Sequence, residues 1–260
     1  MSQKQTTYVR RELSPVEGVH LTQESLPADL ASAYASMRKV IENEDDFGAA
    51  WKLGGTTAAT QKIFNVHKLY FGVLHQKELA VQPDVAPSFP TYELKGEAEI
   101  ALRLAPSVDA LLDQGADAVR SAPLEALFDG WCVALELPSS PVVNLVEMGV
   151  VALVADRCAA GYLALGPCRD LAEMTSWDST QIRVEQNSQQ ITEGSASNLL
   201  SSADDCARSF LLEALEQGFR PRAGQWVSTG GATPCVPFEQ GARIDVYYGQ
   251  SQELSFTAGT

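Results

Sequence analysis

The stretch that most constrains the fold is residues 97–104, where apolar and other side chains alternate with a period of two. Such alternation predicts a β-strand with one face in the core. Glu97 and Glu99 share the opposite face. Two carboxylates side by side repel unless a proton or a cation lies between them. A divalent ion would relieve that repulsion, since Mg²⁺ prefers oxygen ligands.

A second stretch, residues 131–137, places a third carboxylate in a similar setting. Glu136 shares a strand face with the small residues Cys132 and Ala134, and the other face is apolar. A carboxylate on such a strand needs a partner, because burying an unpaired charge is costly. Glutamates also alternate on many solvated strands, so the pattern alone leaves both a metal site and a solvated face open.

The order of the elements predicts the α+β class. Apolar spacing favours helices from near Pro27 to about residue 42, over residues 142–155 and over residues 202–216. The strands are expected at residues 49–55, 97–104, 131–137, 162–165, 224–231 and 243–249, with a hairpin over residues 182–192. We place the boundary in a proline-rich connection, which separates an N-terminal helical portion, residues 1–85, from a strand-rich body, residues 86–260.

The composition excludes several classes of function. A net charge of −14 supplies no basic face for nucleic acid. Five cysteines without a Cys-x-x-Cys pair favour neither a disulfide framework nor a zinc site. No apolar run suits a membrane span, and residues 1–13 lack the apolar core of a signal peptide, so a cytoplasmic location is expected. His20, His67 and His75 show no metal-ligand spacing, and a Gly-x-Gly-x-x-Gly motif is absent.

The motifs, taken in order, resemble the 2-keto-4-pentenoate hydratase and 4-oxalocrotonate decarboxylase family of the fumarylacetoacetate hydrolase superfamily. The matching segments are residues 51–57 (WKLGGTT), 71–74 (FGVL), 96–101 (GEAEIA), 134–137 (ALEL), 154–156 (VAD) and 222–230 (RAGQWVSTG). They keep the family's order over nearly the whole chain.

The resemblance implies a fumarylacetoacetate-hydrolase-like mixed β-roll with a smaller helical N-terminal portion. It implies Mg²⁺ or Mn²⁺ on Glu97, Glu99 and Glu136, with Lys52 as the catalytic residue beside the ion. A nearby cation would lower the pKa of Lys52 and suit it to proton transfer. Without the resemblance, the sequence favours a surface lysine at position 52.

The candidate substrate-binding residues are Leu53, Ser228, Thr229 and Gly230. Backbone N–H groups of residues 228–231 could position a substrate carboxylate, or the segment could be only a turn. The implied substrates are short 2-oxo acids or their 2-hydroxydienoate tautomers, and the implied assembly is a homo-oligomer, with a pathway enzyme as a further partner.

The favoured reaction is hydration of a 2-hydroxydienoate to a 4-hydroxy-2-oxo acid through an enolate that the cation stabilises. A decarboxylase of an oxalocrotonate-type acid, a C–C hydrolase of acylpyruvates and a catalytically altered assembly partner of the same fold remain alternatives.

Several positions depart from the family pattern, including residues 157–159 and the turn at residues 194–198. Ser139 stands in place of an aspartate, Pro141 in place of an arginine, and Arg157 in place of an asparagine. Loss of the arginine, with small residues at 139, 140, 159 and 160, predicts a preference for monocarboxylates or bulkier 2-oxo acids. Alternatively, Arg157 replaces the lost charge.

Overall fold

The computed structural model describes residues 7–10, 18–42, 47–86, 94–174 and 178–259. Its α-helices there are α1 (Leu30–Glu42), α2 (Ala58–Phe64), α3 (Val108–Gln114), α4 (Ala116–Ser121), α5 (Leu124–Leu127), α6 (Leu145–Ala155) and α7 (Ala203–Glu216). Short 3₁₀ turns form η1 (Gln23–Ser25), η2 (Gln76–Glu78), η3 (Arg157–Ala159), η4 (Leu171–Glu173) and η5 (Ala196–Asn198). None of the helices in this part of the chain is long and apolar enough to span a bilayer.

The described strands form two sheets. The larger has the order β2 (Tyr70–His75), β1 (Phe47–Gly54), β10 (Trp226–Gly231), β5 (Lys95–Leu104), β6 (Phe128–Leu137), β7 (Tyr162–Leu165) and β3 (Leu79–Val81), with β11 (Val236–Pro237) paired to β5. The smaller has the order β4 (Val85–Ala86), β13 (Ser251–Ala258), β12 (Arg243–Tyr248), β8 (Ile182–Gln186) and β9 (Gln189–Gly194). Both sheets are mixed, because β1 pairs with β10 and β13 pairs with β4 in parallel while most other pairs are antiparallel. The α+β class predicted from the sequence is confirmed.

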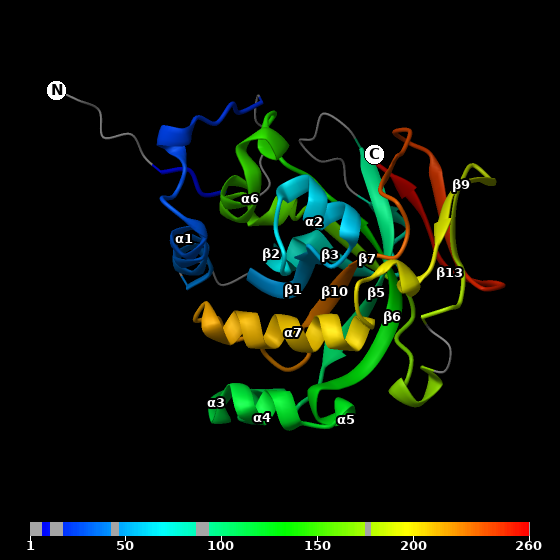
Figure 1. Cartoon of the computed structure of the whole chain (residues 1–260). Coiled ribbons are helices and arrows are strands. Elements are labelled where there is room, and N and C mark those ends of the chain that lie inside the picture. Colours follow the sequence, from blue (N-terminus) through cyan, green and yellow to red (C-terminus); the bar gives the residue numbers. More distant parts are fainter. Residues whose placement is uncertain (1–6, 11–17, 43–46, 87–93, 175–177, 260) are drawn as a thin grey trace.

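Helix α7 packs on the core face of the larger sheet. Figure 1 shows α7 crossing in front of β10 and β5. In this view α3 to α5 lie below α7, and the smaller sheet lies at the right. Ser202 caps α7 by accepting a hydrogen bond from Asp205 N at 3.4 Å, and the helix buries Cys206, Phe210 and Leu211 against the sheet. These inward-facing residues are those that the helical spacing predicts.

The two faces of β5 and β6 differ in the way that the alternation predicts. One face contributes to the main hydrophobic core through Ile100, Leu102, Val133 and Leu135. The other carries smaller residues, Ala101, Cys132 and Ala134, which form a second cluster with Leu163 and Leu165. The three glutamates lie on this second face.

The structure differs from the sequence-based elements in several places, among them α2, β2, β3, β4 and β11, which were not predicted. The helix expected over residues 142–155 begins at Leu145 and breaks at Gly149, whose φ of 80° is not helical. Helices α3 to α5 were not predicted, because each is too short to develop a recurring apolar stripe. Strand β13 was missed as well, whereas the hairpin turn at Asn187 and Ser188 is confirmed, with φ values of 50° and 66°.

The first 85 residues do not form a purely helical part. They supply β1, β2 and β3 to the larger sheet, where β1 pairs directly with β10 from the C-terminal half. Lys52 therefore lies inside the same sheet as the glutamates, and the division of the chain at residue 85 stays a prediction.

Candidate metal centre

Strands β5 and β6 bring the three glutamates together. Glu97 lies directly opposite Glu136 in the antiparallel ladder, and Glu99 follows two residues along on the same face. One carboxylate oxygen from each residue lies within 4.8 Å of the others. Cross-strand pairing and the two-residue period therefore bring the three carboxylates close to one point.

Burial makes this cluster unfavourable without a cation. Glu99 and Glu136 are 0% and 1% exposed. Glu99 Oε1 and Glu136 Oε2 are buried and accept no hydrogen bond within the described residues. Burial first, and then the charge of Glu136, raises the pKa of Glu97 to about 7 and that of Glu99 well above its ordinary value. Unpaired carboxylate oxygens of this kind fit a hard divalent cation.

Strand β10 orients Glu99 through a local irregularity. The ladder with β5 shifts register between Ser228 and Gly231. As a result, the Ser228 hydroxyl and Gly230 N–H both donate to Glu99 Oε2, the latter at 2.9 Å. Gly230 has a φ of 102°, and a Cβ there would lie 2.0 Å from Thr56 Oγ1. Only glycine permits this backbone path, which places the donor against Glu99.

Lys52 reaches the cluster on the same face of the sheet, from strand β1. It pairs with Ser228 across β1 and β10, is 7% exposed, and its ammonium forms an ion pair with Glu136. Burial disfavours the ammonium, but the charges of Glu136 and Glu97 outweigh it and raise the pKa of Lys52 above its ordinary value. The protein's own charges thus raise the pKa of Lys52, whereas a bound cation is expected to lower it.

The other candidate site residues divide between the two sheet faces. Ser228 and Gly230 contact Glu99, as described above. The Thr229 hydroxyl instead donates to Ile100 O at 2.9 Å. The Leu53 side chain is buried in the main hydrophobic core, so only its backbone is positioned to take part in a site on the glutamate face.

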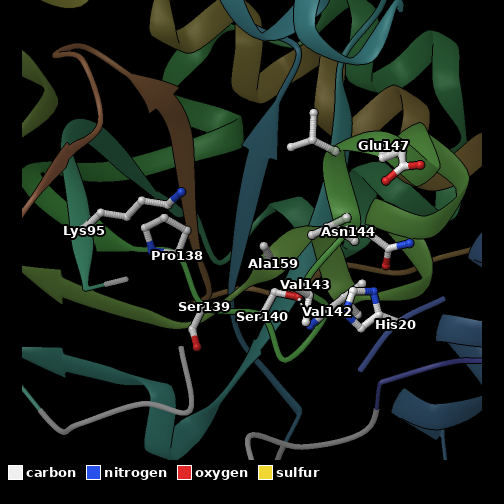
Figure 2. A pocket seen from close by; sticks show the side chains of 12 residues that line it. His20, Lys95, Pro138, Ser139, Ser140, Val142, Val143, Asn144, Glu147 and Ala159 are labelled. Carbon is white, nitrogen blue, oxygen red and sulfur yellow. Dashed lines mark hydrogen bonds between the residues drawn. The ribbon is translucent and has the colours of Figure 1, made fainter. Parts of the chain in front are cut away.

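A cavity of about 770 Å³ opens beside the start of β5 and the end of β6, next to the Glu97–Glu136 pair. Lys95 and Pro138 line it, and each lies two residues beyond the Glu97–Glu136 pair. Figure 2 shows these two side chains on one side and the start of α6 on the other. The remaining lining residues are His20, Ser139, Ser140, Val142, Val143, Asn144, Leu145, Val146, Glu147 and Ala159.

Of the positions that depart from the family motif, Ser139 lines this cavity, whereas Pro141 and Arg157 do not. Ser139, Ser140 and Ala159 line it, in keeping with the space that their small side chains predict. Sequence reasoning missed Lys95, because a lysine at the start of a strand resembles any surface lysine. Its place at the cavity depends on the β5–β6 pairing, which only the fold reveals.

Arg157 is buried and engaged elsewhere. Its guanidinium forms a two-point ion pair with Glu78, both distances being 2.9 Å, and donates to Val73 O at 2.9 Å. A guanidinium held in this way is not directed at the cavity. This arrangement counts against the alternative in which Arg157 replaces the lost arginine.

Comparison with known proteins identifies the fold. No known family profile matches the sequence. The structure resembles that of 4-oxalocrotonate decarboxylase from Pseudomonas putida G7 in complex with magnesium and adipate, with a TM-score of 0.78 and 20% identity over 93% of this chain and 91% of that chain.

Two further structures show lower but clear similarity. Fumarylpyruvate hydrolase from Pseudomonas aeruginosa, in complex with Mn²⁺ and pyruvate, matches with a TM-score of 0.57 and 17% identity over 81% of this chain and 88% of that chain. A Yersinia pestis CO92 protein assigned to the fumarylacetoacetate hydrolase family matches with a TM-score of 0.57 and 14% identity over 80% and 92%. At these identities the similarity establishes the fold: the chain adopts the fold shared by 4-oxalocrotonate decarboxylase and proteins of the fumarylacetoacetate hydrolase family, as the sequence motifs predict.

Proposed function

We propose that the chain is a divalent-metal-dependent lyase that acts on short 2-oxo acids or 2-hydroxydienoates. Its favoured reaction is the hydration of a 2-hydroxydienoate to a 4-hydroxy-2-oxo acid. The observation that carries the proposal is the cluster of half-buried Glu97 with buried Glu99 and Glu136, beside Lys52. The magnesium and manganese complexes of two proteins with this fold support Mg²⁺ or Mn²⁺ as the ion.

The three glutamates would hold the ion, which supplies positive charge to a 2-oxo acid and favours its enolate. Ser228 and Gly230 keep one oxygen of Glu99 fixed by hydrogen bonds, so that Oε1 stays directed into the cluster. Hydrogen bonds of this kind orient metal ligands and tune their affinity.

Lys52 is the group that would move protons. Its ammonium lies against Glu136 on the face that carries the glutamates. The raised pKa keeps Nζ protonated when the glutamates are charged and no cation is bound, and it makes the ammonium a weak proton donor in that state. Neutralisation of the glutamates by a cation removes the attraction that raises this pKa, which would let Nζ accept a proton.

The cavity suits a substrate with an uncharged tail. Val142, Val143, Leu145 and Val146 give its far wall an apolar part, beside the polar side chains of His20, Asn144 and Glu147. Burying a second carboxylate against such a wall would be costly without a partner. We therefore expect monocarboxylates to bind better than dicarboxylates of equal length.

Decarboxylation of an oxalocrotonate-type acid is the second candidate. The strong similarity in fold to 4-oxalocrotonate decarboxylase favours it, and Lys95 at the cavity would offer a positive charge to a second carboxylate. A shared fold alone does not decide the reaction.

A direct assay separates these candidates. The protein is incubated with 2-hydroxypenta-2,4-dienoate or with oxalocrotonate, with Mg²⁺ or with EDTA, and the loss of substrate absorbance is followed. We expect Mg²⁺-dependent hydration that disappears in Glu99→Gln and persists in a control, Glu239→Gln, at an exposed position. Consumption of oxalocrotonate alone, with release of CO₂, would favour the decarboxylase. Equal rates with EDTA would refute the metal-dependent proposal.

A further inference from the structure

A buried arginine from the N-terminal segment contacts the wall of the cavity from behind. Residues 7–10 lie along the end of α6, where Arg10 N donates to Ala155 O at 3.0 Å. The Arg10 side chain is 5% exposed although it comes from a segment outside the sheets. A buried arginine needs partners for its charge and its donors, and within the described residues Arg10 has them at both terminal nitrogens although not at Nε.

The partners of Arg10 come from two separate parts of the chain. Its guanidinium donates to Ser139 O, in the loop after β6, and to Ala160 O, just before β7. It also forms an ion pair with Asp156, at 3.3 Å. Tyr8 from the same segment donates to Asp156 at 2.5 Å, so the pair is itself held in place. One planar guanidinium therefore ties two loops together.

Those two loops form the inner wall of the cavity. Ser139 and Ala159 both line it, and Ser139 N donates to Ala159 O at 2.8 Å. Ser139 follows Glu136, a member of the glutamate cluster, by only three residues. Arg10 does not line the cavity itself, so its influence must act through the positions of these loops.

We propose that Arg10 is a positioning residue that sets the inner wall of the cavity and thereby the affinity for substrates long enough to reach it. This inference rests on the proposed function. The fork geometry of arginine is needed, because a lysine ammonium is a single point and cannot hold two carbonyl oxygens in the same way. Losing one Arg10 contact leaves the two loops joined by the Ser139 N–Ala159 O hydrogen bond and the β6–β7 ladder, so they shift locally at the cavity wall. The glutamates, held by the β5–β6 ladder, stay in register.

The test compares short and long 2-oxo acids on the Mn²⁺-loaded protein by calorimetric titration. Pyruvate would contact the metal cluster only, whereas 2-oxohexanoate would extend along the wall. We expect Arg10→Lys to leave pyruvate affinity within about two-fold. It should weaken 2-oxohexanoate binding by about five-fold, the factor that corresponds to about 1 kcal/mol.

Arg208 provides a matched control. It donates to the carbonyl oxygens of Val119 and Ala122 at 2.8 Å and so also clamps backbone segments, but it does not line or support the cavity. Arg208→Lys should lower thermal stability without changing the ratio of the two affinities.

Each outcome decides the inference. If Arg10→Lys weakens both ligands equally, or neither, Arg10 only stabilises the fold and the inference is wrong. Arg10→Ala is a second, stronger variant, and Arg10→Lys remains informative where the alanine variant fails to fold. If the unaltered protein binds neither Mn²⁺ nor pyruvate, the proposed function fails and this inference falls with it.

Discussion

Replacing Glu97 by glutamine should stabilise the metal-stripped protein at pH 8. Burial and the charge of Glu136 raise the pKa of Glu97 from an ordinary 4.5 to about 7. Each pH unit of such a rise corresponds to about 1.4 kcal/mol. Ionised Glu97 therefore destabilises the folded state by up to about 3 kcal/mol at high pH.

The sign follows from proton binding. Between pH 4.5 and pH 7 the folded protein holds a proton on Glu97 that the unfolded chain has released, so the free energy of unfolding falls as the pH rises through this window. Below pH 4.5 Glu97 is protonated in both states and does not lower the free energy of unfolding. Glutamine, which never ionises, removes the penalty at pH 8 and has little effect near pH 4.5.

The assay is thermal and urea unfolding in EDTA at pH 4.5 and pH 8, repeated with Mg²⁺ at pH 8. In EDTA at pH 8, Glu97→Gln should raise the melting temperature by on the order of 6 °C. Mg²⁺ should stabilise the unaltered protein and much less the variant. Glu239→Gln, at an exposed position, should show neither effect. A variant that is less stable in EDTA at pH 8, or that Mg²⁺ stabilises fully, would refute the reasoning.

Three further substitutions test the parts of the site separately. Lys52→Met should slow exchange of the C3 protons of pyruvate with D₂O by about 100-fold or more, measured by NMR, while the circular dichroism spectrum stays unchanged; unaltered exchange would remove Lys52 from the mechanism. Ser228→Ala removes a donor to Glu99 and should weaken Mn²⁺ binding by about ten-fold, measured by calorimetry; equal affinity would show that the hydrogen bond does not orient the ligand. Gly231→Ala places a Cβ 2.4 Å from Glu97 Oε2 and should weaken Mn²⁺ binding by about ten-fold or more in a folded protein, and retained affinity would show that the carboxylate is not needed there.

The glutamate cluster is the part of the site that local sequence patterns predict best. The two-residue period of a strand places Glu97 and Glu99 on one face, and small neighbours mark the face of Glu136. The pattern cannot supply the register that sets Glu97 opposite Glu136, because strand pairing depends on the whole sheet. The motif resemblance, and not the local pattern, grouped the three glutamates as ligands of one ion and identified Lys52 as a candidate.

The ion pairs of Arg10 and Arg157 could not be predicted from the sequence. Arg10 pairs with Asp156 across 146 residues, and Arg157 pairs with Glu78 across 79. No local spacing connects such partners, and each residue alone resembles a surface charge. The break at Gly149 was missed for a related reason, since an apolar run of residues predicts a helix whether or not one glycine within it leaves the helical conformation.

Anomalous diffraction from a crystal soaked in Mn²⁺ tests the central claim most directly. The account predicts one strong anomalous peak per chain, with carboxylate oxygens of Glu97, Glu99 and Glu136 at about 2.0–2.6 Å from it, as is typical of hard divalent cations. The peak should be lost in Glu136→Gln. A density map without a peak between these glutamates, or a peak unchanged in that variant, would contradict the account.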